Sequence, residues 1–468
     1  MQDIIEMFAR AHAAQKEYEQ CSQKVYDKVA RIIGKTVHDN AEILAIEAVE
    51  ETGMGTVPSK VEKQRRITKM TWLQMRDLPS KGVVGWETGK LEHECILKIA
   101  KPAGVIASVL PSTNPTSAMA NNGMMAVKGG NAVIFCPHPK AKNVSKHCVE
   151  MIRAAIKSLG VPEDIVQILE NPSFEATQAA MAAADLVIAT GGPGMVKSAY
   201  SSGTPALGVG QGNCQVVVDK DMAYAFDALA KKLIANRAYD NGIPCTGEQN
   251  VIIPEADKDA MIAALENNGA YVFTDKALVD KLRSVIFVHD ETNDTYSLSR
   301  KIVGLTPQEI GKLIGIDVPE DKKILSFPVE KYGNDELLCR EILCPLTRIL
   351  TYSGEFEEGV HIARTNLMME GAGHSSDVYS DIREHQIYAG EQMPVCRLIV
   401  NNGNSLVGGA NYESGFRTTS TVGCGFWGGS SIDVNVTFEH LLNYTRLYYT
   451  VEAEKEVPSD EEIWAEVE

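Results

Sequence analysis

The sequence predicts an α/β protein built on parallel sheets, and three observations support this fold class. Short apolar runs alternate with helical stretches from residue 104 to residue 219. The same alternation continues through residues 220–400. The runs are apolar at nearly every position, which is typical of parallel strands covered by helices on both faces. Because ligands of such sheets bind at the carboxyl ends of the strands, we expect the functional residues in the loops that follow them.

The length, charge and cysteine content of the chain exclude several classes of protein. The chain has 468 residues and a net charge of −17, with 45 Lys and Arg against 62 Asp and Glu. This length predicts two to four domains, and the acidic balance argues against a nucleic-acid partner. No apolar run approaches the roughly 18–20 residues of a membrane helix, so we expect no membrane partner. The ten cysteines lack a disulfide spacing and the start lacks a signal-peptide core, which predicts a cytoplasmic protein with reduced thiols.

The elements of the first half follow from hydrophobic periodicity. Helical spacing predicts helices over residues 3–50 and 60–78. Residues 86–104 alternate instead, which predicts a strand pair with one exposed face. The regular α/β series then places strands at 104–110, 132–136, 165–169, 185–190, 206–210 and 215–219, and helices at 116–128, 143–158, 173–184 and 195–202.

The second half repeats this pattern and predicts a second α/β domain. Its helices are expected at 223–238, 256–266 and 275–286, and its strands at 249–253, 271–273, 324–328 and 348–352. Residues 401–431 are rich in Gly, Asn, Ser and Thr, and a loop of this length in a compact protein is usually functional. The acidic run at 452–468 is expected to be solvated surface.

One cysteine has the surroundings of a nucleophile. Cys245 lies in NRAYDNGIPCTGEQN (236–250), after a predicted helix and a Gly-x-Pro turn and before a strand. A loop exposes the thiol, so that a thiolate can form and attack. From the local sequence alone, a small buried core residue is the commoner alternative.

Three other segments carry candidate site residues. Asn114, between two prolines after a strand, could donate to a developing oxyanion or could bond its own backbone in a turn. The loop Gly191–Gly194 follows a strand and opens a helix, which suits a phosphate, although it lacks the G-x-G-x-x-G pattern and a plain turn is the alternative. His374, in EGAGHSS, is expected in a Gly-rich loop that orients a substrate or bonds the backbone.

Two cysteine-containing segments have the residue types of metal ligands. Neither has a zinc spacing, and we therefore expect no metal site. The segments are Cys136-x-His138 with His147-Cys148, and Cys339 with Cys344.

Taken together, these segments resemble the aldehyde dehydrogenase superfamily, and within it the CoA-acylating branch. The branch signature DNGxxCxxEQ is present at 240–249. EILCPL (341–346) is similar to E-x-x-G-P-V, with Cys344 in place of glycine, and TVGCGFWGGSS (421–431) resembles the acylating branch. YDNGIPC, YSSGTPALGVGQGN and EGAGHSS resemble coenzyme-A-dependent succinate-semialdehyde dehydrogenases.

The resemblance implies a fold with a Rossmann-type cofactor domain, an α/β catalytic domain and a small oligomerisation arm. The expected divisions are 1–86 with 101–218 for the cofactor domain, 219–403 for the catalytic domain, 87–100 with 431–452 for the arm, and 404–430 for a Gly-rich loop returning to the cofactor-domain side. Through the arm we expect a homodimer or a dimer of dimers.

The resemblance also implies roles for individual residues. Cys245 would be the nucleophile, and its backbone N–H and the Asn114 side chain would form the oxyanion hole. Glu341 would bind the nicotinamide ribose. The remaining cofactor contacts would come from Thr190, Gly191 and Gly194 along the pyrophosphate or nicotinamide path, and from Pro137, His138 and Pro139 at the adenosine end. His374 and Arg237 would contact substrate, with Arg348 and Arg397 as further candidates for a substrate carboxylate.

Two departures from the hydrolytic members of the superfamily bear on the reaction. Those members carry a water-activating Glu in E-L-G-G-K, whereas the matching stretch here is ALGVGQG (206–212) and no carboxylate occurs from 203 to 218. Without that base a thiol is a better attacker than water. At the adenosine ribose, Cys136 replaces the usual lysine, and Lys140 and Lys142 could meet a 2′-phosphate, which slightly favours NADP over NAD.

The predicted function is therefore the interconversion of succinyl-CoA and succinate semialdehyde with NAD(P)H, coenzyme A being the co-substrate. An acylating dehydrogenase for acetaldehyde, propionaldehyde or butyraldehyde is the alternative within the branch. A cysteine acyltransferase without nicotinamide would explain Cys245 but leaves Glu341 and the Gly191–Gly194 loop without a role. A non-catalytic nucleotide-binding protein leaves Cys245 and Asn114 without a role.

Overall fold

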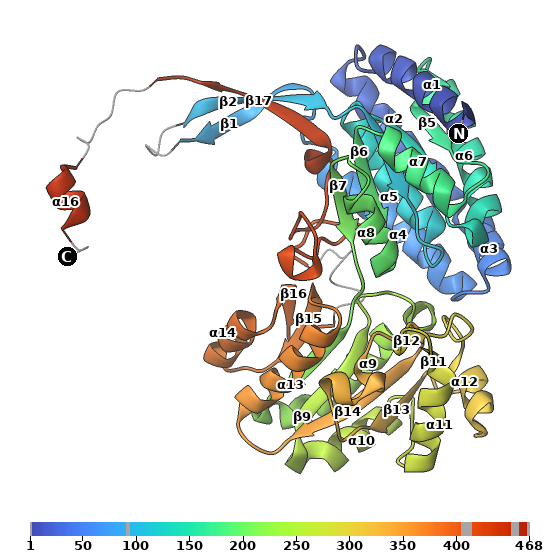
Figure 1. Ribbon diagram of the computed structural model, residues 1–468, viewed down its shortest axis with the longest axis vertical. Helices are drawn as coiled ribbons and strands as arrows, with labels where there is room; N and C mark the ends of the chain where they lie inside the picture. The colour runs from blue at the N-terminus through green and yellow to red at the C-terminus, as the bar shows by residue number, and fades with distance from the viewer. Residues whose placement is uncertain (1, 90–93, 404–413, 451–457, 466–468) are drawn as a thin grey trace.

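Two parallel sheets and a projecting antiparallel ribbon organise the chain (Figure 1). The computed structural model describes residues 2–89, 94–403, 414–450 and 458–465. The first sheet lies in the upper part of the molecule in Figure 1 and the second in the lower part, while the ribbon extends from the first. Among the described residues, no helix combines the length and the apolar character needed to cross a membrane.

The first sheet has five parallel strands in the order β5-β4-β3-β6-β7. Its strands are β3 (Val105–Val109), β4 (Ala132–Cys136), β5 (Val166–Ile168), β6 (Leu186–Thr190) and β7 (Ala206–Val209). The helices around it are α1 (Gln2–Tyr18), α2 (Gln23–Asp39), α3 (Ala41–Thr52), α4 (Val57–Met75), α5 (Pro115–Lys128), α6 (Lys142–Lys157), α7 (Phe174–Ala183) and α8 (Pro193–Tyr200). All five residues of β3 and of β4 are buried, as their continuous apolar sequences predict.

The second sheet has seven parallel strands in the order β10-β13-β14-β9-β8-β15-β16. They are β8 (Cys214–Val218), β9 (Glu248–Pro254), β10 (Ala270–Val272), β13 (Ile324–Pro328), β14 (Leu346–Tyr352), β15 (Gly373–Tyr379) and β16 (Val395–Val400). Its helices are α9 (Phe226–Ala238), α10 (Lys258–Asn267), α11 (Lys276–Ile286), α12 (Pro307–Ile314), α13 (Phe356–Met369) and α14 (Arg383–Gln392), and a hairpin of β11 (Phe287–Asp290) and β12 (Thr295–Leu298) lies beside them.

Two expectations from the sequence are corrected here. Strand β8 was assigned to the first domain, but it pairs with β9 and β15 in the second sheet, so the chain crosses between the sheets at residues 210–213 rather than after 218. The expected Gly-rich loop around His374 is strand β15. Its sequence GHSSDVY is polar, yet every residue is buried between β8 and β16, so hydropathy could not reveal it.

The ribbon joins segments far apart in the sequence. Strand β2 (Glu94–Pro102) pairs antiparallel with β1 (Gly82–Thr88) on one side and with β17 (Leu442–Tyr448) on the other. The period-two segment therefore does form a strand pair, to which the C-terminal part adds a third strand. Before β17, the side chains of Val436 and Phe438 pack into the core of the first sheet and anchor the returning chain there. A short helix, α16 (Asp460–Trp464), lies beyond the ribbon (Figure 1).

Candidate active site

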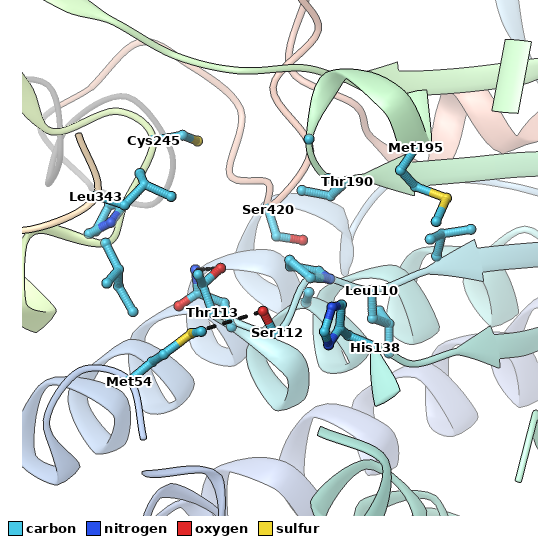
Figure 2. A pocket seen from close by; sticks show the side chains of 18 of the residues that line it. Met54, Leu110, Ser112, Thr113, His138, Thr190, Met195, Cys245, Leu343 and Ser420 are labelled. Carbon is cyan, nitrogen blue, oxygen red and sulfur yellow. Dashed lines mark hydrogen bonds between the residues drawn. The ribbon is translucent and has the colours of Figure 1, made fainter. Parts of the chain in front are cut away.

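A cavity of about 760 Å³ lies where the carboxyl ends of β3, β4 and β6 face the loops of the second sheet (Figure 2). Figure 2 shows Cys245 and Leu343 on one side of it and Leu110, His138 and Thr190 on the other. The volume lies within the range of about 300–1,000 Å³ usual for ligand sites. Eight of the predicted site residues line it, namely Asn114, Pro137, His138, Pro139, Thr190, Gly191, Cys245 and Glu341.

A strained turn brings Cys245 to the cavity. Asp240, Asn241 and Gly242 are three consecutive residues with φ of 50°, 52° and 68°. A Cβ on Gly242 would lie 2.6 Å from the carbonyl of Cys344, so glycine is required there on two counts. Asn and Asp tolerate the left-handed region better than other residues. The DNG sequence is therefore the local reason that the chain leaves α9 and turns the thiol inward.

The Cys245 thiol is protonated in the resting site. Burial raises its pKa to about 12, and the Glu341 carboxyl adds to this. The Nε2 atom of His374 lies 3.2 Å from the sulfur, and its Nδ1 lies 2.8 Å from the Ser375 hydroxyl. Burial lowers the pKa of His374 to about 3, so this imidazole is neutral at physiological pH. A neutral ring in contact with the thiol can accept its hydrogen bond and orient it.

Asn114 is held by a lysine. It is the N-cap residue of α5, and the Lys63 ammonium donates to its Oδ1 at 2.5 Å. The same ammonium donates to Asp240 Oδ2 at 2.7 Å. Oδ1 is occupied by Lys63, and one hydrogen of the amide Nδ2 is directed to Thr113 Oγ1 at 3.4 Å, so the second Nδ2 hydrogen is the one that remains to donate into the cavity. Lys63 thus connects the oxyanion donor to the turn that carries the nucleophile.

A second lysine completes this network. The Lys60 ammonium donates to the Thr113 carbonyl at 2.8 Å and to Asp240 Oδ2 at 3.3 Å. Burial lowers the pKa of Lys60 to about 8 although Asp240 opposes this. Burial raises the pKa of Asp240, but Lys63 and Lys60 outweigh it and hold that pKa below the ordinary value. Asp240 is therefore a buried carboxylate with two cationic partners, which is the condition under which a buried charge is tolerated.

Glu341 and the loop at 210–213, where the chain crosses between the two sheets, close the cavity beside Cys245. The Gly212 N–H donates to Glu341 Oε1 at 2.9 Å. A Cβ on Gly212 would lie 2.1 Å from the carbonyl oxygen of Cys245, so the loop that joins the two sheets runs directly against the Cys245 backbone. Burial raises the pKa of Glu341 to about 8, with the Glu370 carboxyl adding to this.

The raised pKa of Glu341 predicts a pH-dependent stability. Between the ordinary value of 4.5 and about 8, the unfolded chain is ionised at this residue while the folded protein keeps the proton, so stability is lost as the pH rises through this window. Glu341→Gln keeps the acceptor for Gly212 and removes the titration. We expect it to raise the Tm of the cofactor-free protein by at least about 2 °C at pH 8 and to leave it nearly unchanged at pH 5.

Thermal unfolding followed by circular dichroism at the two pH values measures this effect, with the exposed Glu384→Gln as the matched control. An equal gain at both pH values would show that ionisation of Glu341 is not the cause.

The far end of the cavity has the features of an adenosine and phosphate site. His138 lines it together with Lys140 and with Arg300, which comes from the catalytic-domain side. Burial lowers the pKa of His138, and the charges of Lys140 and Arg300 add to this. The backbone N–H groups at the N-terminus of α8 follow Gly191 and Gly192, and nothing lies within 4 Å of a Cβ built on Gly192. This open helix start suits a pyrophosphate, so the cavity fits a dinucleotide.

Several predicted residues lie elsewhere. Gly194 lies in the first turn of α8 and Lys142 begins α6, and neither lines the cavity. Arg237 was a candidate for the substrate carboxylate, but it is fully buried and donates to the carbonyls of Ile342, Cys344 and Leu346. Its guanidinium holds the Glu341 segment to the nucleophile segment, and we assign it no substrate contact.

The two alternative arginines are also outside the cavity lining. Arg348 is fully buried and donates to Asn250 Oδ1 at 2.9 Å. Arg397 donates to the His374 carbonyl at 2.7 Å, behind the nucleophile. The cavity instead contains cations that sequence reasoning missed, namely Lys63, Arg66 and Arg300. Lys60, Lys63 and Arg66 recur at intervals of three along α4, a pattern that marks one helix face but not what that face meets.

The segments with metal-ligand residue types do not converge. His147 pairs with Glu47 at 2.9 Å, while Cys136 and Cys148 are buried in the core of the first sheet. Within the described ranges, no group of three or more His, Cys, Asp or Glu side chains is arranged to hold a metal ion.

Comparison with known proteins agrees with this geometry. The model of the aldehyde dehydrogenase family matches residues 1–278. Succinate-semialdehyde dehydrogenase (acetylating) of Clostridium kluyveri is 45% identical over 98% of each chain. An acetylating aldehyde dehydrogenase from Geobacillus thermoglucosidasius superposes with a TM-score of 0.89 at 31% identity, covering 98% of both chains.

A third comparison concerns the chemistry of the cysteine. A Rhodopseudomonas palustris propionaldehyde dehydrogenase, solved with bound CoA and an acylated cysteine, superposes with a TM-score of 0.82 at 26% identity, covering 95% of this chain and 97% of that one. The sequence match, the superposed fold and the pairing of Cys245 with Asn114 in one cavity lead to the same assignment. The chain belongs to the aldehyde dehydrogenase family and resembles its acylating members.

Proposed function

We propose that the protein is a CoA-acylating aldehyde dehydrogenase that interconverts succinate semialdehyde and succinyl-CoA through a thioester on Cys245. One observation supports the acylating reaction, in which coenzyme A attacks the thioester, over the hydrolytic reaction, in which water attacks it. Gly212 packs on the Cys245 backbone, residues 203–218 contain no carboxylate, and Glu341 is the carboxylate among the described residues that line the cavity. Its Oε1 is occupied by the Gly212 N–H and burial favours its protonated form, so it is poorly placed to activate water. The 45% identity to the Clostridium kluyveri enzyme supports the succinyl substrate.

The residues around Cys245 account for the first half of the reaction. The sulfur adds to the aldehyde carbon as its proton is released to solvent, while His374 Nε2, which lies 3.2 Å away, accepts the hydrogen bond of the thiol and orients it. The new oxyanion receives hydrogen bonds from Asn114 Nδ2 and the Cys245 N–H. A bound nicotinamide ring supplies the hydride acceptor. The oxyanion then collapses to a carbonyl, which leaves a succinyl thioester on the sulfur.

The second half of the reaction regenerates the thiol. The thiol of coenzyme A gives up its proton and attacks the thioester carbon, and the same two donors stabilise the oxyanion that forms. The Cys245 sulfur leaves as succinyl-CoA is released, and it takes up the proton that the coenzyme A thiol gave up. In the reverse direction, the enzyme reduces succinyl-CoA to the semialdehyde.

The cofactor is proposed to be NAD(P), bound along the walls between the nucleophile and His138. Glu341 would hold the nicotinamide ribose, Thr190 and Gly191 the pyrophosphate path, and Pro137 to Pro139 the adenosine end. Lys140 and Arg300 line the cavity near His138 and favour a cofactor with a 2′-phosphate, hence NADP over NAD.

The two sheets support the proposed domain roles. The cofactor domain is built on the first sheet and the catalytic domain on the second, with the boundary at 210–213. The ribbon of β1, β2 and β17 is proposed to join protomers into a dimer or a dimer of dimers, and elution as a monomer of 51.0 kDa in gel filtration would contradict it.

The proposed activity is tested by following nicotinamide absorbance with succinate semialdehyde, NAD or NADP, and coenzyme A present or omitted. We expect reduction that depends on coenzyme A and is faster with NADP. Reduction without coenzyme A would indicate a hydrolytic enzyme. Succinyl transfer between thiols with no reduction of either nicotinamide cofactor by the aldehyde would indicate a cysteine acyltransferase.

A further inference from the structure

A cation in the cavity has an unused hydrogen-bond donor. Arg66 lies on α4 and lines the cavity that contains Cys245, and its side chain is 24% exposed. Its Nε atom is buried and has no hydrogen-bond partner among the described residues. A buried donor on a charged group that lacks a partner is costly, and an anion bound there would remove that cost.

The rest of the guanidinium is fixed by its neighbours. Its Nη1 atom lies 3.2 Å from Glu62 Oε1 and its Nη2 donates to the Tyr239 hydroxyl at 3.3 Å. The guanidinium carbon also lies 5.4 Å from the centre of the Tyr239 ring. The Tyr239 hydroxyl in turn donates to Glu62 Oε2 at 2.6 Å, which orients all three groups. The guanidinium is therefore held in a set orientation, and its planar fork of N–H donors matches a carboxylate.

The position of Arg66 on α4 suits contact with the end of a short substrate that is farthest from the reacting carbonyl. Lys63, three residues earlier on the same helix, donates to Asn114 Oδ1. Side chains three residues apart on a helix are about 5–6 Å apart at their Cβ atoms. A four-carbon semialdehyde with its carbonyl at Asn114 can therefore direct its other end toward Arg66.

The other cations of the cavity are committed elsewhere. Lys63 is shared between Asp240 and Asn114. Lys140 and Arg300 lie beside His138, at the end of the cavity assigned to adenosine. Among the described lining residues, Arg66 is thus the cation near the nucleophile's end that has an unused donor.

We propose that Arg66 binds the distal carboxylate of the aldehyde substrate and thereby selects an acidic semialdehyde over an uncharged aldehyde of the same length. This inference rests on the proposed function and adds to it the residue that distinguishes succinate semialdehyde from butyraldehyde.

The test compares kcat/KM for succinate semialdehyde and for butyraldehyde in Arg66→Ala, Arg66→Lys and the wild type. We expect Arg66→Ala to lower the ratio of the two values about 10- to 100-fold, mainly through the KM for succinate semialdehyde, since a hydrogen bond to a charged group is worth about that factor. Arg66→Lys should recover part of the ratio. The neighbouring, exposed Arg65→Ala is the matched control and should keep it.

An equal loss for both aldehydes in Arg66→Ala would assign Arg66 a structural role and overturn the inference. An unchanged ratio would overturn it as well. In either case the wild-type reaction would leave the acylating function intact. A wild-type protein with no CoA-dependent activity on either aldehyde would instead overturn the proposed function itself.

Discussion

Cys245→Ala is expected to lower the rate of CoA-dependent aldehyde oxidation by at least about 10⁴-fold, since loss of a covalent nucleophile has effects of this size or larger. The sulfur is the atom that forms the thioester, and no neighbouring side chain can replace it. The lost group is small and partly exposed at the cavity, so the fold should be retained. The rate is measured by nicotinamide absorbance, with thermal unfolding to confirm that the variant is folded.

Cys21→Ala is the matched control, because Cys21 is a partly exposed thiol outside the cavity. It should retain the wild-type rate. Substantial CoA-dependent turnover by folded Cys245→Ala would show that the reaction does not pass through this sulfur.

The second large effect is expected at the oxyanion donor. Asn114→Ala should lower kcat about 10²- to 10³-fold, the usual loss when one such donor is removed. Lys63→Met should also lower kcat, by about tenfold, because Lys63 fixes the amide by bonding to its Oδ1. Asp240 keeps Lys60 as a partner in that variant, so the turn that carries Cys245 should remain folded.

The double variant tests whether Lys63 affects kcat by positioning Asn114 or by an independent effect of its own charge. If Lys63 acts through Asn114, then Asn114→Ala combined with Lys63→Met should be no slower than Asn114→Ala alone. Multiplication of the two effects would contradict the positioning role. Lys69→Met, an exposed lysine on the same helix, is the control and should leave kcat unchanged.

Much of the fold could be predicted because buried parallel strands are visible in the sequence. The runs that became β3, β4 and β6 are apolar at nearly every position, and their bounds agree with the structure to within about two residues. Strand β15 could not be found this way, since its polar side chains are buried by neighbouring strands rather than by their own hydropathy. Likewise, the sequence does not reveal that β8 leaves the first sheet, because its buried, largely apolar sequence suits an interior strand of either sheet.

The candidate site likewise contains residues that could be predicted from the sequence and residues that could not. Cys245 and Asn114 could be selected because the motifs around them together resemble the acylating branch, whereas their local sequences alone left a plain structural role open, and the structure brings both to one cavity. Arg237 was a wrong choice because its sequence position beside the nucleophile turn does not indicate that its guanidinium points into backbone carbonyls. Arg66 was missed because its contact with the cavity depends on how α4 packs against Tyr239, a residue 173 positions away.

The central claim, a succinyl thioester on Cys245, can be tested without a nicotinamide cofactor. The purified protein is incubated with succinyl-CoA alone and its intact mass and cysteine-containing peptides are measured. The account predicts one added succinyl group, located on the peptide that contains Cys245, with free coenzyme A released and the group removed again by excess coenzyme A. An unmodified protein, or a succinyl group on any other cysteine, would contradict it.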